Sequence, residues 1–272
     1  MNYKDEIKAV AFDYDGTLID FQYRTYEPTI DALERLCASR YKVALMSGRP
    51  SFLAKKSFEK DFPGLKLDYV FGCNGSEVYD AQKDETKLLH PVSAFDIRRL
   101  GALFEDAPFL YLGIYDGEKF LVNHRIDSEE LIEWMNARWL TPIEFDYQTN
   151  DVPRSKVLVL NEKKDRDREI EYIRKLDLSD LNGFYSSPYC FEIAPKGISK
   201  ATSVSYLASE LNCNEKQILA FGDNDNDMEM LMCATGVIME NARKELKDRI
   251  PLHTDRVDKL GIYDFLSRNG LI

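Results

Sequence analysis

Short apolar runs recur in the first and last thirds of the chain. The runs at 7–12, 42–46, 68–71 and 217–221 are continuous rather than alternating. Continuous apolar runs of this length are typical of strands buried on both faces, as in a parallel sheet. Each run passes directly into a polar cluster; these are Asp13-Tyr14-Asp15-Gly16-Thr17, Ser47-Gly48-Arg49, Gly72-Cys73-Asn74-Gly75 and Gly222-Asp223. Because ligands bind beyond the carboxyl ends of such strands, we expect the clusters to share one edge of the sheet.

Helical patterns lie between these runs. Pro28 can open one helix. A second is predicted over 198–211, where apolar residues follow the i, i+3, i+4, i+7 spacing of one helical face: Val204, Leu207, Ala208 and Leu211. Alternating strands and helices predict an α/β fold with a Rossmann-like, doubly wound parallel sheet.

The middle of the chain has a different pattern. Asp116-Gly117 lies between apolar runs at 109–115 and 119–122, which is a strong signal for a two-residue hairpin. Helical patterns at 128–137 and 165–176 alternate with strand patterns at 156–160 and 189–193. We therefore predict an α+β cap domain inserted at 86–187 into a catalytic core formed by 1–85 and 188–272.

Composition narrows the classes of partner. The 272 residues suffice for about two domains. Lys and Arg total 36 and Asp and Glu total 47, which gives a formal charge of −11. This acidity argues against nucleic acid or an anionic membrane as a partner, because both favour a basic face. The five cysteines form no CxxC pair, the first residues are polar, and no apolar run approaches the ~20 residues of a membrane span. We expect a soluble, cytoplasmic protein.

Two carboxylates separated by one residue, Asp13 and Asp15, follow the first apolar run. Such a pair can point into one site, and Gly16 permits the tight turn that this requires. An ordinary Asp-Gly turn is the alternative interpretation.

Three more carboxylates, those of Asp223, Asp225 and Asp227, occur within five residues after the run at 217–221. A solvated acidic loop or a helix N-cap is the alternative interpretation. A calcium-binding EF-hand loop is excluded, since its sixth and twelfth positions would be Met228 and Ala234.

Carboxylates of both clusters would repel one another in a single cleft unless a cation lay between them. Oxygen ligands favour a hard cation, so Mg²⁺ is the expected metal. We expect an anionic ligand beside it, contacted by Lys200 at the start of the second helix and by the hydroxyl, backbone N–H and guanidinium of Ser47-Gly48-Arg49. A surface lysine and an ordinary turn are the alternatives for these two segments.

The clusters DYDGTL, SGR, GISKA and GDNDND, in this order, resemble the four motifs of the haloacid dehalogenase (HAD) superfamily phosphatases. The segment Cys73-Asn74-Gly75, the large insert and Glu192-Ile193-Ala194-Pro195 are similar to the Cof-type sugar-phosphatase branch. The resemblance covers nearly the whole chain. It departs at Tyr14, where Leu is usual, and at Ala201, where the branch usually has Gly.

This resemblance implies a role for each motif residue. Asp13 would be the nucleophile and Asp15 the general acid and base. Phosphate binding would involve Ser47, Gly48, Arg49, Lys200 and Asn226. The Mg²⁺ ion would be held by Asp13, the Asp15 carbonyl and Asp223, with Asp227 in support.

The expected function is a Mg²⁺-dependent phosphatase that acts on a small phosphorylated metabolite, with sugar phosphates as the expected class, through an aspartyl-phosphate intermediate. Two alternatives remain at this point. A phosphomutase or phosphotransferase would pass the phosphoryl group to a second hydroxyl rather than to water. A sensor would bind a phosphorylated ligand in the same pocket without turnover.

Overall fold

The computed structural model describes residues 3–272. The chain divides into two compact units. The first comprises Met1–Lys87 and Ile198–Ile272, and the second Leu88–Gly197. The second unit ends at 197 rather than at the expected 187, because strand β11 (Cys190–Pro195) pairs with two other strands of this unit, β10 (Leu181–Ser187) and β9 (Val157–Leu160).

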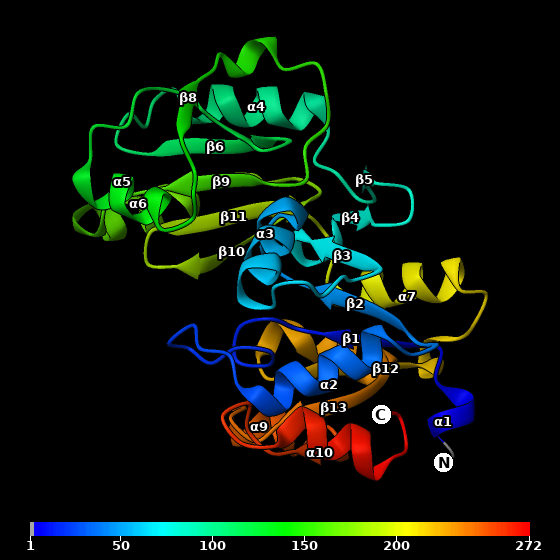
Figure 1. The fold of residues 1–272 in the computed structure, drawn as a ribbon. Helices are drawn as coiled ribbons and strands as arrows, with labels where there is room; N and C mark the ends of the chain where they lie inside the picture. Colours follow the sequence, from blue (N-terminus) through cyan, green and yellow to red (C-terminus); the bar gives the residue numbers. More distant parts are fainter. Residues whose placement is uncertain (1–2) are drawn as a thin grey trace. The chain divides into compact units, whose positions relative to one another are not determined.

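The first unit is built on a sheet with the strand order β14-β13-β12-β1-β2-β3-β4-β5 (Figure 1). All pairs from β14 to β3 are parallel, and β4 is antiparallel to β3. The parallel-sheet core expected from the continuous apolar runs is therefore confirmed. The strands are β1 (Ala9–Phe12), β2 (Lys42–Met46), β3 (Tyr69–Gly72), β4 (Glu77–Asp80), β5 (Glu85–Leu88), β12 (Ile218–Gly222), β13 (Thr235–Met239) and β14 (Leu252–Thr254).

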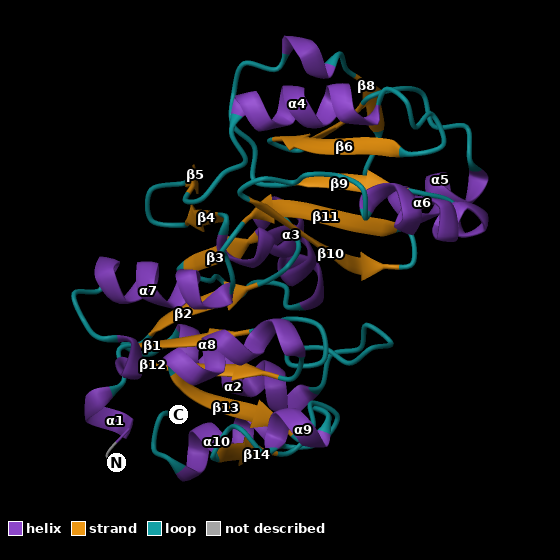
Figure 2. Ribbon diagram, turned by 180° about the vertical axis from the view of Figure 1, so that it is seen from behind, coloured by secondary structure: helices purple, strands orange, loops and turns teal. Residues whose placement is uncertain are grey.

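Helices cover both faces of this sheet. Apolar side chains of α2 (Glu27–Cys37), α3 (Ser51–Asp61) and α10 (Gly261–Arg268) share one core cluster with β1 and β2. Helices α7 (Lys200–Glu210) and α8 (Met228–Cys233) contact each other on the opposite face, which Figure 2 shows from behind. The short helices α1 (Tyr3–Glu6) and α9 (Lys244–Lys247) complete the unit. The order of strands and helices is that of a doubly wound fold.

The second unit is a mixed α/β layer. Its sheet has the order β10-β11-β9-β6-β7-β8 and adds β6 (Tyr111–Asp116), β7 (Lys119–Val122) and β8 (Pro142–Glu144) to the strands given above. The predicted hairpin joins β6 and β7, and Gly117 adopts a φ of 59° in its turn. Helices α4 (Ala94–Phe104) and α6 (Arg166–Ile173) pack on one core cluster of this sheet, and α5 (Glu129–Asn136) follows the hairpin.

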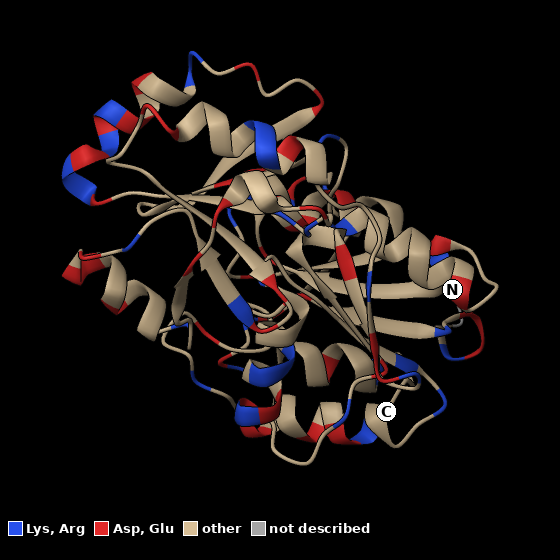
Figure 3. Cartoon of the chain, turned by 90° about the horizontal axis from the view of Figure 1, so that it is seen from above, with Lys and Arg blue, Asp and Glu red and all other residues tan. Residues whose placement is uncertain are grey.

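Charged residues of both signs follow one another along the helices (Figure 3). Ion pairs one turn apart join several of them, including Arg35–Asp31, Lys175–Glu171 and Arg268–Asp264. Within residues 3–272, no helix combines the length and the apolar character that crossing a bilayer would require.

Candidate active site

Four of the predicted polar clusters follow strands that are neighbours in the first unit. The strand order β12-β1-β2-β3 is parallel throughout, so the carboxyl ends of these strands meet at one edge of the sheet. The residues after the strands are Asp223, Asp13, Ser47 and Cys73, respectively. This topology brings together segments that lie more than half the chain apart in sequence.

Three buried carboxylates form the centre of this edge. Asp13, Asp223 and Asp227 each offer an oxygen, and these oxygens all lie within 4.8 Å of one another. Lys200, the first residue of α7, has no exposed surface and places its Nζ 2.5 Å from Asp13 Oδ1 and 2.6 Å from Asp227 Oδ1. One ammonium group thus faces three carboxylates, which leaves the cluster short of positive charge.

Burial of these groups has a clear electrostatic consequence. Desolvation, with the negative charge of Asp227 as the next cause, raises the pKa of Asp13 well above its usual value, although Lys200 opposes the shift. The same two causes raise the pKa of Asp223 from 3.8 to about 7. The ionised forms of these carboxylates are therefore unfavourable in the folded protein unless further positive charge is present.

The donor set fits a hard divalent cation. Among the acidic, histidine and cysteine side chains of residues 3–272, the possible ligands grouped here are three carboxylates, and the pKa values of Asp13 and Asp223 are both raised. Oxygen ligands of this kind suit Mg²⁺ better than a soft metal. The structure thus shows an acidic group that could hold a metal ion.

Asp227 has a different set of contacts. Its Oδ2 accepts hydrogen bonds from the backbone N–H groups of Asp223 and Asn224, both at 3.0 Å, while its Oδ1 meets Lys200. Both oxygens are thus engaged within the protein. Asp227 orients the loop that carries Asp223 and the ammonium group of Lys200.

Asp15 points to a different partner. Its carboxylate accepts hydrogen bonds from Arg49 Nη2 at 2.6 Å and Nε at 3.2 Å. The Arg49 guanidinium also donates to Ser57 Oγ at 2.9 Å and lies 5.2 Å from the centroid of the Tyr14 ring. Tyr14 is buried and donates to Asp61 at 2.6 Å. The aromatic ring at the position where Leu is usual therefore supports Arg49.

The remaining predicted phosphate-binding residues lie around Asn74. Ser47 is buried, and its Oγ accepts a hydrogen bond from the Arg49 N–H. The backbone N–H of Asn74 donates to the Ser47 carbonyl, and Asn74 Oδ1 would lie 3.3 Å from a Cβ placed on Gly48. Asn226 is exposed and donates to the same Oδ1 at 3.4 Å. Asn74 thus joins the loops of 47–49 and 224–227.

Two further residues contact Asp223, and neither was predicted from the sequence to have a role in the site. Thr17 Oγ donates to Asp223 Oδ1 at 3.3 Å. Asn241 Nδ2 donates to Asp223 Oδ2 at 2.9 Å and to the Gly16 carbonyl at 3.0 Å. Thr17 belongs to the first motif, and Asn241 follows a buried strand, β13, as Asp13, Ser47 and Asp223 follow theirs. The position of Asn241 after a strand is the feature of the sequence from which its role could have been predicted.

Gly16 is required by the close approach of two loops. Its φ is +91°, a conformation that residues with a Cβ rarely adopt. A Cβ at this position would lie 2.3 Å from Asp223 Oδ2 and 2.8 Å from the Phe21 ring. The glycine therefore lets the loop after β1 approach the Asp223 carboxylate.

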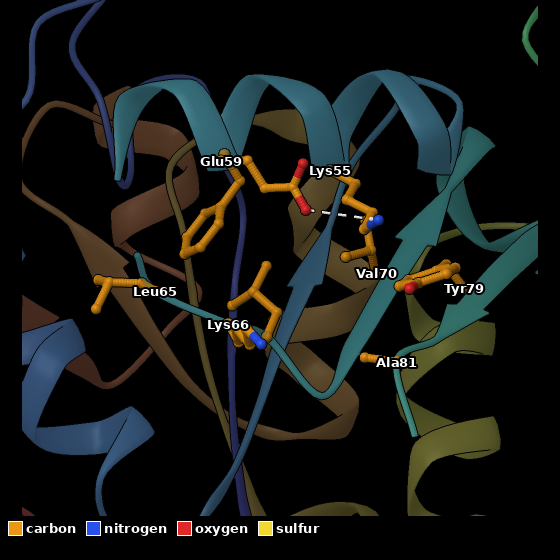
Figure 4. A pocket seen from close by; sticks show the side chains of 9 residues that line it. Lys55, Glu59, Leu65, Lys66, Val70, Tyr79 and Ala81 are labelled. Atoms are coloured by element: carbon orange, nitrogen blue, oxygen red, sulfur yellow. Dashed lines mark ion pairs between the residues drawn. The ribbon is translucent and has the colours of Figure 1, made fainter. Parts of the chain in front are cut away.

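A groove of about 290 Å³ elsewhere in the first unit holds none of these residues. It lies against α3, β3 and β4, and its wall includes Lys55, Glu59 and Tyr79 (Figure 4). Lys55 pairs with Glu59 at 3.5 Å and lies 4.6 Å from the centroid of the Tyr79 ring. Its cationic group is thus already engaged within the wall.

The raised pKa of Asp223 predicts a pH dependence of stability. In the unfolded chain this carboxyl ionises near pH 3.8, and in the folded, metal-free protein near pH 7. Between these values the folded state binds the additional proton, so the free energy of unfolding falls as pH rises, and the loss is complete above pH 7. We expect Asp223→Asn to become more stable relative to wild type at pH 8 than at pH 5, as measured by urea unfolding in EDTA.

Asp31→Asn is the matched control, because Asp31 forms an exposed ion pair with Arg35. The difference in the free energy of unfolding between Asp31→Asn and wild type should be the same at pH 5 and pH 8. An equal difference between Asp223→Asn and wild type at both pH values would contradict the prediction.

Comparison with known proteins agrees with this architecture. The HMP-PP phosphatase of Serratia proteamaculans is 25% identical over 251 residues, which cover 90% of this chain and 88% of the relative. The solved structure of a haloacid dehalogenase-like hydrolase from Bacteroides thetaiotaomicron has a TM-score of 0.82 at 23% identity and covers 96% of this chain and 99% of that one. BT4131, described as a HAD subclass IIB sugar phosphatase, has a TM-score of 0.74 at 20% identity, with 97% and 100% covered.

The haloacid dehalogenase-like hydrolase family matches this sequence over residues 10–266. That range includes every motif residue discussed above and nearly all of both units. The resemblance found in the sequence is confirmed: the chain is an enzyme and belongs to the haloacid dehalogenase-like hydrolase family.

Proposed function

We propose that this enzyme is a Mg²⁺-dependent phosphatase that hydrolyses small phosphomonoesters through an aspartyl-phosphate intermediate. The observation that carries the proposal is the cluster of Asp13, Asp223 and Asp227 around the fully buried Lys200. A protein that only binds a phosphorylated ligand does not need a carboxylate beside the ammonium group that binds the phosphate. An enzyme that attacks phosphorus with a carboxylate needs the carboxylate at that position.

The residues divide the reaction into two displacements. An oxygen of Asp13 attacks phosphorus, the bond from phosphorus to the ester oxygen breaks, and Asp15 gives its proton to that oxygen. Water then attacks the aspartyl phosphate while Asp15 removes a proton from it. Inorganic phosphate leaves, and Asp13 returns to its carboxylate form.

Mg²⁺ held by Asp13, Asp223 and the Asp15 carbonyl, with Asp227 in support, would offset the negative charge of the carboxylates and of the phosphoryl group. Lys200 would contact a phosphoryl oxygen from its position between Asp13 and Asp227. Ser47, the Gly48 N–H and Asn226 would bind the remaining oxygens. These roles are proposals that the observed geometry supports.

The Arg49–Asp15 pair adds one condition to this mechanism. Both side chains are partly exposed, so a bound phosphoryl group can compete with Asp15 for the guanidinium. Transfer of Arg49 to the substrate anion would free Asp15 for proton transfer. Substrate binding and the availability of the acid would then be linked.

The proposed substrates are small phosphorylated metabolites, with sugar phosphates as the first class to test. The HMP-PP phosphatase and the sugar phosphatase among the similar proteins support a phosphate ester as the reacting group. We further propose that Leu88–Gly197 is the cap that selects the leaving group. None of the five cysteines, all of which lie within residues 3–272, forms a disulfide with another, and this suits a reducing compartment such as the cytoplasm.

The test is turnover of p-nitrophenyl phosphate by the purified protein, followed by a panel of sugar phosphates, nucleotides and cofactor phosphates. We expect EDTA to abolish turnover and added Mg²⁺ to restore it, because the cluster lacks positive charge without the metal. Unchanged turnover in EDTA would contradict the metal requirement. An isomerised sugar phosphate in place of free phosphate would identify a mutase, and tight binding without phosphate release would identify a sensor.

A further inference from the structure

Asn241 joins three loops at the edge of the sheet where the carboxylates meet. It follows β13, and its Nδ2 donates to the Gly16 carbonyl in the loop after β1 and to Asp223 Oδ2 in the loop after β12. The two hydrogens of the amide nitrogen are therefore both used. Since both partners are acceptors, the hydrogen-bond network requires the nitrogen, and not the oxygen, at this position.

The other end of the same amide has no partner. Asn241 Oδ1 is buried and receives no hydrogen bond from any residue in 3–272. A buried acceptor without a donor lowers stability, and such groups in native proteins call for a specific explanation, which includes a bound water or ion. Asn161 Oδ1, in the second unit, is also buried and unpartnered, so an orphaned oxygen does not by itself identify a site.

The surroundings distinguish Asn241 from Asn161. The oxygen and nitrogen of one amide are about 2.3 Å apart, so the unpartnered oxygen of Asn241 lies close to the Asp223 carboxylate that its nitrogen contacts. Asn161 Nδ2 instead donates to the neighbouring Glu162 carbonyl. Mg²⁺ in proteins usually keeps several of its water molecules, and those waters are donors.

We propose that Asn241 is a positioning residue of the metal site. Its nitrogen holds Asp223 in place, and its oxygen accepts a hydrogen bond from a water molecule of the Mg²⁺ ion. The inference rests on the proposed function, because it assumes that Asp223 is a metal ligand. Residues that support metal ligands in this way typically change metal affinity or activity by 10- to 100-fold when they are replaced.

The experiment is calorimetric titration of Mg²⁺ into protein stripped with EDTA and dialysed, without substrate. Asn241→Leu has a similar size but no polar atoms, and Asn241→Ala is prepared in parallel, so that either variant with a native circular dichroism spectrum decides the result. We expect the Kd for Mg²⁺ to rise about 10- to 100-fold. The Mg²⁺ concentration for half-maximal turnover should rise by the same factor, and kcat at saturating Mg²⁺ should return close to that of wild type.

Asn161→Leu is the matched control, because it removes an equally buried, unpartnered amide oxygen outside the first unit. Its Kd for Mg²⁺ should equal that of wild type. An Asn241 variant whose Kd lies within about twofold of wild type, or whose lost turnover is not restored by Mg²⁺, would overturn the proposal. Failure of the wild type itself to bind Mg²⁺ would overturn the proposed metal dependence as well, and the two failures are thereby distinguished.

Discussion

Asp13→Asn is expected to lower kcat for p-nitrophenyl phosphate by about 10⁴- to 10⁶-fold, which is the range found when single members of a catalytic unit are removed. An amide oxygen at this position is a much weaker nucleophile towards phosphorus than a carboxylate. The same substitution should not lower the thermal stability of the metal-free protein. The raised pKa of Asp13 means that its ionised form is disfavoured in the folded state, and Lys200 keeps Asp227 as a partner after the substitution.

Two measurements test this expectation, steady-state turnover with Mg²⁺ and the melting temperature in EDTA. Asp31→Asn makes the same chemical change at the exposed ion pair with Arg35 and should leave turnover unchanged. Turnover of Asp13→Asn within tenfold of wild type would show that another group attacks phosphorus. A large fall in melting temperature would show that the Asp13–Lys200 contact stabilises the fold more than the carboxylate repulsion destabilises it.

Lys200→Met is expected to lower the free energy of unfolding by about 3–5 kcal/mol at neutral pH in EDTA, together with a loss of turnover. Methionine fills a similar volume without the ammonium group. Asp13 and Asp227 would then keep their buried carboxylates without the cation that lies 2.5 Å and 2.6 Å from them. Burial lowers the pKa of Lys200, whereas the negative charges of Asp13 and Asp227 raise it. The net shift is upward, so the attraction to the two carboxylates outweighs the cost of burial.

Urea unfolding measures this loss, and a second substitution identifies its origin. Asp227→Asn in the Lys200→Met background removes one of the stranded charges and should recover part of the stability. Lys175→Met is the control, because Lys175 forms an exposed pair with Glu171 and should have little effect. A double variant no more stable than Lys200→Met would contradict the assignment of the loss to uncompensated carboxylates.

Local sequence patterns identified most elements of the fold. The run at 42–46 forms β2 with those bounds, and the runs at 7–12 and 217–221 contain or overlap β1 and β12. These segments are predictable because a strand buried on both faces must be apolar at every position. The Asp116-Gly117 hairpin was predictable for a similar reason, since its turn needs a residue that tolerates a positive φ.

The end of the second unit was less predictable. The strand pattern at 189–193 is correct, but a strand carries no local mark of the sheet it joins. Pairing of β11 with β9 and β10 assigns it to the second unit. The sheet that β11 joins depends on which sheet edges are available for pairing in the folded protein.

The candidate site divides in the same way. The spacing in DYDGTL and GDNDND was enough to expect a cation among carboxylates on loops after strands, and the resemblance to the family's motifs then singled out Asp13, Asp15, Asp223 and Asp227. The spacing alone could not show that Lys200 is fully buried between Asp13 and Asp227 or that Arg49 pairs with Asp15.

By itself, then, the sequence determined the parallel-sheet core, the family and the polar residues that carry the expected chemistry, since all three depend on residue type and spacing within short segments. Only the tertiary structure decided the partners of those residues. Asn241 is the clearest case, because it is 18 residues from Asp223 and 225 from Gly16 and contacts both. Such contacts arise where parallel strands end side by side, and that proximity depends on strand order rather than on any local pattern.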